Sequence, residues 1–144
     1  MTTLREKQEA TARALFDGYN QYTADAVLRV RAPECIHSWW PTSMKRPSKT
    51  NDEFREFFKP MEKTMKNYKV KIHKIINDPE THTLALYATG TGESAAAPYQ
   101  GEYCFFLTFT EDGEKITQIE QFVDSAFAYN YLAKVNEYNE KHSS

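Results

Sequence analysis

Apolar residues recur along the chain with two different spacings, and these spacings predict two kinds of secondary structure. In the first part of the chain they return every three to four residues, as on one face of a helix. This spacing predicts helices over residues 4–19 and 24–31, with Pro33 ending the second helix. A third helix is expected from Thr50, which forms a capping-box pattern with Glu53.

From Lys69 onward, apolar and polar residues alternate, which is typical of strands. We predict four long strands, rich in β-branched and aromatic residues, at 69–77, 83–93, 99–110 and 115–124. Short turns containing Asp, Pro or Gly separate the first pair and the last pair, so each pair is expected to form an antiparallel hairpin. A shorter strand is predicted over 35–40, and a last helix after Ser125.

This order of elements predicts an α+β fold. Helices that are segregated from a mostly antiparallel sheet belong to that class. A sheet of this size twists and curls, so N-terminal helices can close its concave face into a cone-shaped α+β barrel. Such a cone holds side chains at its narrow end and a small-molecule ligand at its mouth. The length fits one domain over residues 1–144.

Composition and charge narrow the range of partners. The net charge is −2 and no basic stripe separates from the acids, so we expect no nucleic-acid partner. No apolar run approaches the roughly 20 residues that span a bilayer, and the N-terminus lacks a signal-peptide pattern. We therefore expect a cytoplasmic protein with no membrane partner. Cys35 and Cys104 are isolated among apolar neighbours and are interpreted as buried thiols.

The sequence contains no cluster with metal-ligand spacing and no glycine-rich phosphate loop, so we expect chemistry without a metal or cofactor. Candidate chemistry lies instead in the last predicted strand. Glu120, Phe122 and Asp124 are spaced two apart and would share one face of that strand. A face that carries two acids either meets water or lines a pocket, and the sequence pattern leaves both possibilities open.

Five segments together resemble the fungal SnoaL-like proteins of the nuclear-transport-factor-two-like superfamily. They are RAPECIH (31–37), TNDEFREFF (50–58), KVKIHKI (69–75), YQGEY (99–103) and DGEKITQIEQFVDS (112–125). The resemblance covers nearly the whole chain and implies the cone-shaped fold. The superfamily includes isomerases, dehydratases, epoxide hydrolases and polyketide cyclases, and also members that only bind ligands. Several fungal members are similar to small isomerases and cyclases of polyketide, xanthone or meroterpenoid gene clusters.

The resemblance also implies positions for site residues. It places Asp124, the acid that ends the last strand, in the mouth of the cone, and it makes His73 a pocket residue. The pocket of limonene epoxide hydrolase uses an Arg-x-Asp pair on a central strand. The matching strand here offers Gln100, Glu102 and Tyr103, so epoxide hydrolysis is not expected.

Three residues are candidate catalytic groups: His73, Asp124 and Glu102. His73 could exchange a proton near neutral pH, or it could be an ordinary surface or core histidine. Asp124 could accept a proton beside a carbonyl or orient His73, or it could only cap the last helix. Glu102 lies either in water or in the pocket. If the first two act together, we expect them within about 2.6–3.2 Å or one water of each other.

The candidate substrate-binding residues are Arg31, His37, Trp39, Tyr87, Tyr103, Glu120 and Phe122. Arg31 could bind a substrate carboxylate or phenolate, or it could stabilise the end of the helix that it follows. Tyr103 could donate a hydrogen bond to a developing enolate. His37 and Trp39 would share one face of their strand, so either both enter the cone or neither does.

These features favour a cofactor-independent isomerase or cyclase that moves protons on a ketone- or phenol-bearing polyketide or meroterpenoid in fungal secondary metabolism. A dehydratase would use the same acid–base steps. The alternative from another class is a non-catalytic protein of the same fold that binds small molecules or dimerises. In either case we expect a homodimer through the outer face of the sheet.

Overall fold

The computed structural model describes residues 2–143 and shows an α+β architecture. Its helices are α1 (Leu4–Gln21), α2 (Ala24–Leu28), α3 (Asn51–Thr64) and α4 (Ser125–His142). Its strands are β1 (Arg31–Trp40), β2 (Lys66–Asp78), β3 (Thr83–Glu93), β4 (Pro98–Phe109) and β5 (Ile116–Val123). They form one sheet in the order β1-β5-β4-β3-β2, antiparallel except for the parallel β1–β5 pair. The predicted fold class and hairpins are confirmed.

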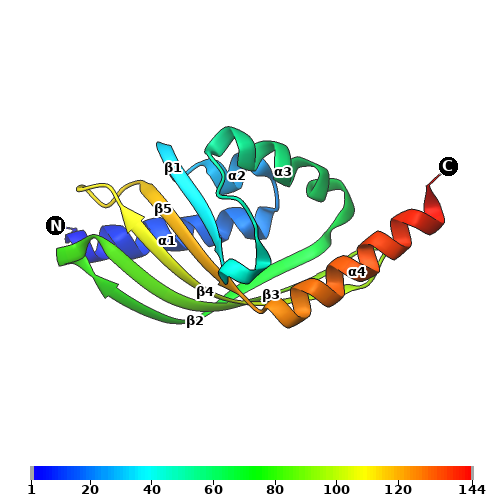
Figure 1. Cartoon of the computed structure of the whole chain (residues 1–144). Helices are drawn as coiled ribbons and strands as arrows, with labels where there is room; N and C mark the ends of the chain where they lie inside the picture. The colour runs from blue at the N-terminus through cyan, green and yellow to red at the C-terminus, as the bar shows by residue number, and fades with distance from the viewer. Residues whose placement is uncertain (1, 144) are drawn as a thin grey trace.

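The curled sheet has a concave side, which three helices cover. In Figure 1, α1, α2 and α3 lie on the concave side, while α4 extends from the end of β5 away from the body. The buried core fills the space between these helices and the inner side of the sheet, and includes Leu15, Phe16, Val27, Phe54, Phe58, Leu84, Leu86, Phe105, Leu107 and Ile119. Burying these side chains is the main favourable contribution to folding.

Two helices begin with a capping box, and the one at Thr50 confirms the prediction. Thr50 forms a complete capping box with Glu53 at the start of α3, and Thr3 forms one with Glu6 at the start of α1. Each box satisfies backbone N–H groups that have no partner inside the helix. Pro60 lies within α3, which continues for four more residues to Thr64.

The segment around Pro33 differs from the prediction. The second helix ends at Leu28 rather than Arg31, and β1 begins at Arg31 rather than Cys35. Proline is tolerated in edge strands and at bulges, because there its missing N–H need not join the ladder. Strand β1 is at the sheet edge, and its register is irregular between Arg31 and Ile36. Pro33 therefore sits inside a strand instead of ending a helix.

None of the helices found within residues 2–143 combines the length and the apolar character required to cross a membrane.

Candidate functional site

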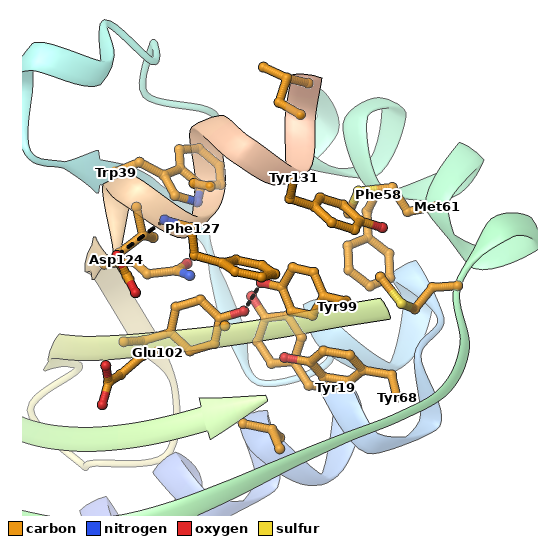
Figure 2. Close-up of a pocket in the computed structure, with 18 of the residues that line it drawn as sticks. Tyr19, Trp39, Phe58, Met61, Tyr68, Tyr99, Glu102, Asp124, Phe127 and Tyr131 are labelled. Carbon is orange, nitrogen blue, oxygen red and sulfur yellow. Dashed lines mark hydrogen bonds between the residues drawn. The ribbon is translucent and has the colours of Figure 1, made fainter. Parts of the chain in front are cut away.

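A cavity of about 420 Å³ opens on the concave side of the sheet, between α1, α3 and the start of α4 (Figure 2). Its walls are mostly aromatic and include Phe16, Tyr19, Tyr22, Trp39, Phe54, Phe57, Phe58, Tyr68, Tyr99, Tyr103, Phe127 and Tyr131. This volume and this apolar lining are typical of sites for small organic molecules. The aromatic-rich composition of the chain therefore contributes to a pocket as well as to a core.

Tyrosine hydroxyls supply much of the polarity inside the cavity. Burial raises the pKa of Tyr19, Tyr22, Tyr68 and Tyr103 above the usual value of 10. The hydroxyls of Tyr99 and Tyr103 hydrogen-bond to each other (Figure 2). Because these groups stay protonated at neutral pH, they can act as hydrogen-bond donors or acids but not as bases.

Arg46 brings a positive charge to the cavity wall. It follows the short 3-10 helix η1 (Thr42–Met44), and its guanidinium lies 5.0 Å from the Trp39 ring centre and 5.5 Å from that of Phe57. Burial lowers the pKa of Arg46, which remains a cation. Within residues 2–143 it forms no salt bridge, so its charge is available to an anionic ligand oxygen. The sequence did not indicate this role, because the segment between Pro41 and Pro47 has the composition of an ordinary loop.

The two candidate carboxylates, Asp124 and Glu102, lie on the same side of the cavity, away from Tyr19 and Tyr68 (Figure 2). Asp124 caps α4, because its Oδ1 accepts a hydrogen bond of 3.3 Å from the Phe127 backbone N–H. It also lines the cavity, so its role as a helix cap and its place in the pocket are compatible. The Glu102 carboxylate points outward, where it accepts a hydrogen bond from the Tyr87 hydroxyl on the outer face.

His73 does not join Asp124, and the prediction that the two lie within hydrogen-bond reach is wrong. His73 is exposed and lies outside the cavity lining; its Nε2 and Thr89 Oγ1 are 2.7 Å apart. Val70 and Ile72 of the same strand pack towards the core, and the register shifts between Ile72 and Lys74. Alternation along the strand therefore directs His73 to the opposite side.

Tyr87, Glu120 and Phe122 also lie on the outer face, which corrects their predicted place in the pocket. Tyr87 and Phe122 are exposed and Glu120 is half-buried, and none of the three lines the cavity. Strand β5 instead directs Ile119 and Gln121 inward. The predicted shared face of Glu120 and Phe122 is the outside of the sheet, whereas Asp124 lies beyond the end of β5 and does line the cavity. A hydrogen bond to the Glu102 carboxylate raises the pKa of Tyr87.

Arg31 and His37 are buried behind the cavity wall and are absent from its lining. Arg31 Nη2 donates to His37 Nδ1 at 3.2 Å, and its guanidinium lies 4.1 Å from the centre of the Phe54 ring. Burial lowers the pKa of Arg31, and burial together with the neighbouring Arg31 charge holds the pKa of His37 well below 6.5. The predicted direct contact of these two residues with substrate is therefore wrong, whereas Trp39 and Tyr103 do line the cavity.

Gln121 is a polar residue of the cavity wall that the sequence analysis missed. Its side chain is buried, and its Oε1 lies 2.8 Å from His37 Nε2. The available signal was its position two residues after Ile119, on the inward parity of the last strand. Among residues 2–143 we find no group of three or more His, Cys, Asp and Glu side chains placed to hold a metal ion.

Comparisons with known proteins identify the family. A family model described as "SnoaL-like domain" matches residues 12–119. The chain belongs to the SnoaL-like family. This confirms the resemblance found in the sequence, and the curated relatives are proteins of fungal secondary-metabolite gene clusters.

Two curated relatives show the range of names within the SnoaL-like family. Austinoid biosynthesis cluster protein J of Aspergillus calidoustus is 32% identical over 87% of this chain and 78% of its own length. The protein named monooxygenase dmxR10, from Cryptosporiopsis sp., is 28% identical over 92% of this chain and 90% of its own length.

Solved structures agree on the cone-shaped fold. BvnE pinacolase from Penicillium brevicompactum matches with a TM-score of 0.90 and 26% identity, covering 94% of this chain and 98% of that one. PrhC from Penicillium brasilianum matches with a TM-score of 0.89 at 22% identity, covering 95% of this chain and 93% of that one, and supports the fold alone. The family match, together with the similarity to a pinacolase, supports an enzyme.

Proposed function

We propose that this SnoaL-like protein is a cofactor-independent isomerase or cyclase that acts by proton transfer on a ketone- or phenol-bearing polyketide or meroterpenoid. The observation that carries the proposal is the aromatic cavity with few polar groups, which include tyrosine hydroxyls, the Arg46 cation and the Asp124 carboxylate. Aromatic walls suit a flat, mostly apolar carbon skeleton. The similarity to a pinacolase and to gene-cluster proteins of fungi supports the same substrate class.

In this proposal Asp124 is the general base. Its carboxylate removes a proton from the carbon next to a substrate carbonyl, and the carbonyl oxygen gains negative charge as the enolate forms. Tyr103, hydrogen-bonded to Tyr99, and the cation of Arg46 stabilise that oxygen. Return of the proton to another atom gives an isomer. In a cyclisation the enolate carbon attacks a second carbonyl carbon of the same substrate, the π bond of that C=O breaks as the new C–C bond forms, and the resulting alkoxide takes the proton held by Asp124. A dehydratase reaction would differ only in expelling hydroxide from the enolate.

Deuterium exchange tests the proton transfer without knowledge of the natural substrate. 1-Tetralone and related cyclic ketones that carry hydrogen on the carbon next to the carbonyl are incubated with the protein in D₂O, and deuterium at that carbon is measured by mass spectrometry. The wild type is expected to accelerate exchange, and Asp124→Asn to slow it by about 100-fold. Asparagine caps helices as well as aspartate does, so the fold should survive. His73→Ala serves as the control and should exchange at the wild-type rate, whereas an undiminished rate in Asp124→Asn contradicts the proposal.

Monooxygenation is a second candidate function, because several relatives carry that name, including AacuO of Aspergillus aculeatus at 28% identity over 98% of this chain. The aromatic cavity would accept the same phenolic substrates. Dioxygen consumption with anthrone, followed by mass spectrometry of ¹⁸O incorporation, separates the two reactions. Oxygen uptake without deuterium exchange favours the monooxygenase. Tight binding with neither reaction favours a non-catalytic binding protein.

We further propose that the protein is a cytoplasmic homodimer whose two copies pack through their outer sheet faces. Large apolar side chains are exposed on that face, with Phe122 at 46%, Phe106 at 39% and Tyr87 at 38% exposure. Exposed apolar patches of this kind commonly mark protein interfaces. Analytical ultracentrifugation is expected to give about twice the monomer mass, and a monomer at all concentrations contradicts this part.

A further inference from the structure

A series of two hydrogen bonds links Arg31 and His37, which lie behind the cavity wall, to Gln121 in the wall itself. Arg31 is 5% exposed, His37 is 1% exposed and Gln121 is 8% exposed. Arg31 Nη2 is 3.2 Å from His37 Nδ1, and His37 Nε2 is 2.8 Å from Gln121 Oε1. Burying polar atoms is costly unless they are hydrogen-bonded, and the two hydrogen bonds offset only part of this cost because Arg31 Nε and Nη1 have no partner in the described residues.

Donor and acceptor roles in this series follow from Arg31. A guanidinium can only donate, so His37 Nδ1 must accept and therefore carries no proton. The neutral ring then has its proton on Nε2, which donates to Gln121 Oε1. The low pKa of His37, caused by burial and by the Arg31 charge, keeps the ring neutral and preserves this tautomer.

The same logic fixes the Gln121 carboxamide. If the carboxamide were turned over, its NH₂ group would face the His37 Nε2–H, and two donors would oppose each other. The oxygen is therefore held towards His37, and the nitrogen takes the other position. Within residues 2–143 the Gln121 nitrogen has no hydrogen-bond partner, although the side chain lines the cavity and the nitrogen is not fully enclosed.

The charge near the Arg31–His37–Gln121 hydrogen bonds favours a ligand atom that is negative or a strong hydrogen-bond acceptor. Arg31 stacks on the Phe54 ring at 4.1 Å, and its Nε and Nη1 lack partners in the described part of the chain. The neighbours that interact with its charge are the Tyr19 and Cys35 side chains, and neither is a carboxylate. The positive charge is thus not neutralised locally, and in a medium of low polarity its field reaches the cavity.

We propose that Gln121 is a substrate-binding residue whose NH₂ group donates to a carbonyl or enolate oxygen, and that Arg31 and His37 are positioning residues that hold it in place. This inference rests on the proposed function. It names the side chain that would recognise the ketone oxygen of the substrate. The aromatic walls accept the carbon skeleton, and the preorganised donor discriminates oxygenated ligands from hydrocarbons of the same shape.

A matched pair of ligands tests the donor. Fluorenone and fluorene have nearly the same shape, and only the ketone has an oxygen acceptor. Binding is measured by quenching of Trp39 fluorescence in a Trp40→Phe background, because Trp39 lines the cavity. The starting protein is expected to prefer fluorenone by about tenfold. Gln121→Glu keeps an acceptor oxygen for His37 but replaces the donor, so fluorenone affinity should fall about tenfold while fluorene affinity stays within twofold.

His37 is tested by the same ligand ratio, which a purely structural role would leave unchanged. His37→Leu removes the hydrogen bond that orients Gln121, and the preference for fluorenone should fall about tenfold. His37→Gln can still donate to Gln121, and it should restore most of the preference. Circular dichroism and melting curves establish that both variants fold.

The possible outcomes separate this inference from the proposed function. Equal losses of fluorenone and fluorene affinity in Gln121→Glu would overturn the role of Gln121 and leave the enzyme proposal standing. Failure of the starting protein to bind either ligand would overturn both proposals. The expected ligand preference without deuterium exchange would support Gln121 as an oxygen-binding residue and overturn the proton-transfer reaction.

Discussion

The two faces of the central sheet carry opposite kinds of polar chemistry on the same strands. On the inner face, Tyr103 and Gln121 present neutral donors among aromatic rings. On the outer face, Tyr87 pairs with the Glu102 carboxylate, and His73 contacts Thr89. Apart from the buried cation of Arg31, charged groups of the strands stay where water can reach them, whereas neutral donors can be buried at a smaller desolvation cost. The site is therefore built mainly from residues that carry no charge.

This contrast teaches that the most obviously reactive residue types are a poor guide to the inside of a small cone. Histidine and glutamate in the strands were selected as candidates because of their acid–base chemistry. In a mostly antiparallel sheet with one buried face, the same polarity is the reason that His73 and Glu102 point outward, whereas His37 is buried with hydrogen-bond partners. The polar groups that do reach the cavity include the Arg46 cation from a loop, tyrosine hydroxyls, the Gln121 amide and the Asp124 carboxylate at the start of α4.

The largest expected difference between the two faces is in the free energy of unfolding. Substitution of two adjacent phenylalanines, one on each face, tests it. Phe105 is 2% exposed and packs edge-on against Phe16 with ring centres 5.0 Å apart, whereas Phe106 is 39% exposed. We expect Phe105→Ala to lower the free energy of unfolding by about 3–5 kcal/mol. Phe106→Ala should lower it by less than about 1 kcal/mol in a monomer. Urea unfolding followed by circular dichroism gives both values.

Protein concentration is the control for this pair. If the outer face forms the dimer interface, the cost of Phe106→Ala should grow with protein concentration, since dimerisation stabilises the folded state by mass action. Equal costs for the two variants at every concentration would contradict the assignment of an inner and an outer face.

The next largest effect concerns the charge of Arg46 at the cavity wall. Arg46→Met should weaken binding of 2-naphthoate, a flat anion, by about tenfold, because a charge-assisted contact is lost. Naphthalene affinity should stay within twofold. Lys45→Met is the matched control, since Lys45 is the exposed neighbour and lies outside the cavity lining. A similar loss in both variants, measured by fluorescence titration, would show that the charge acts only at long range.

The fold was largely predictable from the sequence, because it depends on spacing and capping that are local. The capping box at Thr50 and the hairpin turns give the order and direction of most elements. The strand containing Pro33 was not predictable in the same way, since only its position at the sheet edge makes the proline acceptable.

The site was less predictable, because alternation along a strand shows which residues share a face but not which face is buried. Assigning Glu120 and Phe122 to the pocket reversed the faces of β5, and it left Gln121 outside the predicted site. Ile119 is completely buried and has the parity of Gln121, and it would have given the correct choice. The partners of Arg31 and His37 come from distant elements, which spacing cannot show.

A smaller effect is expected from the pH dependence of the free energy of unfolding. This dependence reports on His37 and its buried hydrogen bonds. The pKa of folded His37 lies well below 6.5, so below about pH 6.5 the unfolded chain binds a proton that the folded protein does not. Stability should therefore fall as the pH decreases, by at most about 1.4 kcal/mol per pH unit from this group. Urea unfolding of the wild type and of His37→Gln between pH 7 and 5 measures the slope. The variant should show the shallower slope, and parallel slopes would mean that His37 is not buried as a neutral ring.

The smallest expected effect is a difference in thiol reactivity. Cys35 and Cys104 report on the solvent access of the inner and the outer face, respectively. Burial raises the pKa of the Cys35 thiol to about 11, whereas Cys104 is partly exposed on the outer face of β4. A disulfide reagent such as DTNB attacks the thiolate, so at pH 8 we expect one fast thiol, Cys104, and one that reacts only after unfolding in urea. Cys104→Ser should remove the fast reaction.

Raising the protein concentration sharpens this last test. If two copies cover their outer faces, the reaction of Cys104 should slow as dimers form, while Cys35 remains unreactive throughout. A Cys104 rate that is independent of concentration would mean that the outer face stays open to solvent. Rapid reaction of Cys35 in the folded protein would instead mean that the inner face is more open than its packing indicates, and the comparison of the two faces would lose its basis.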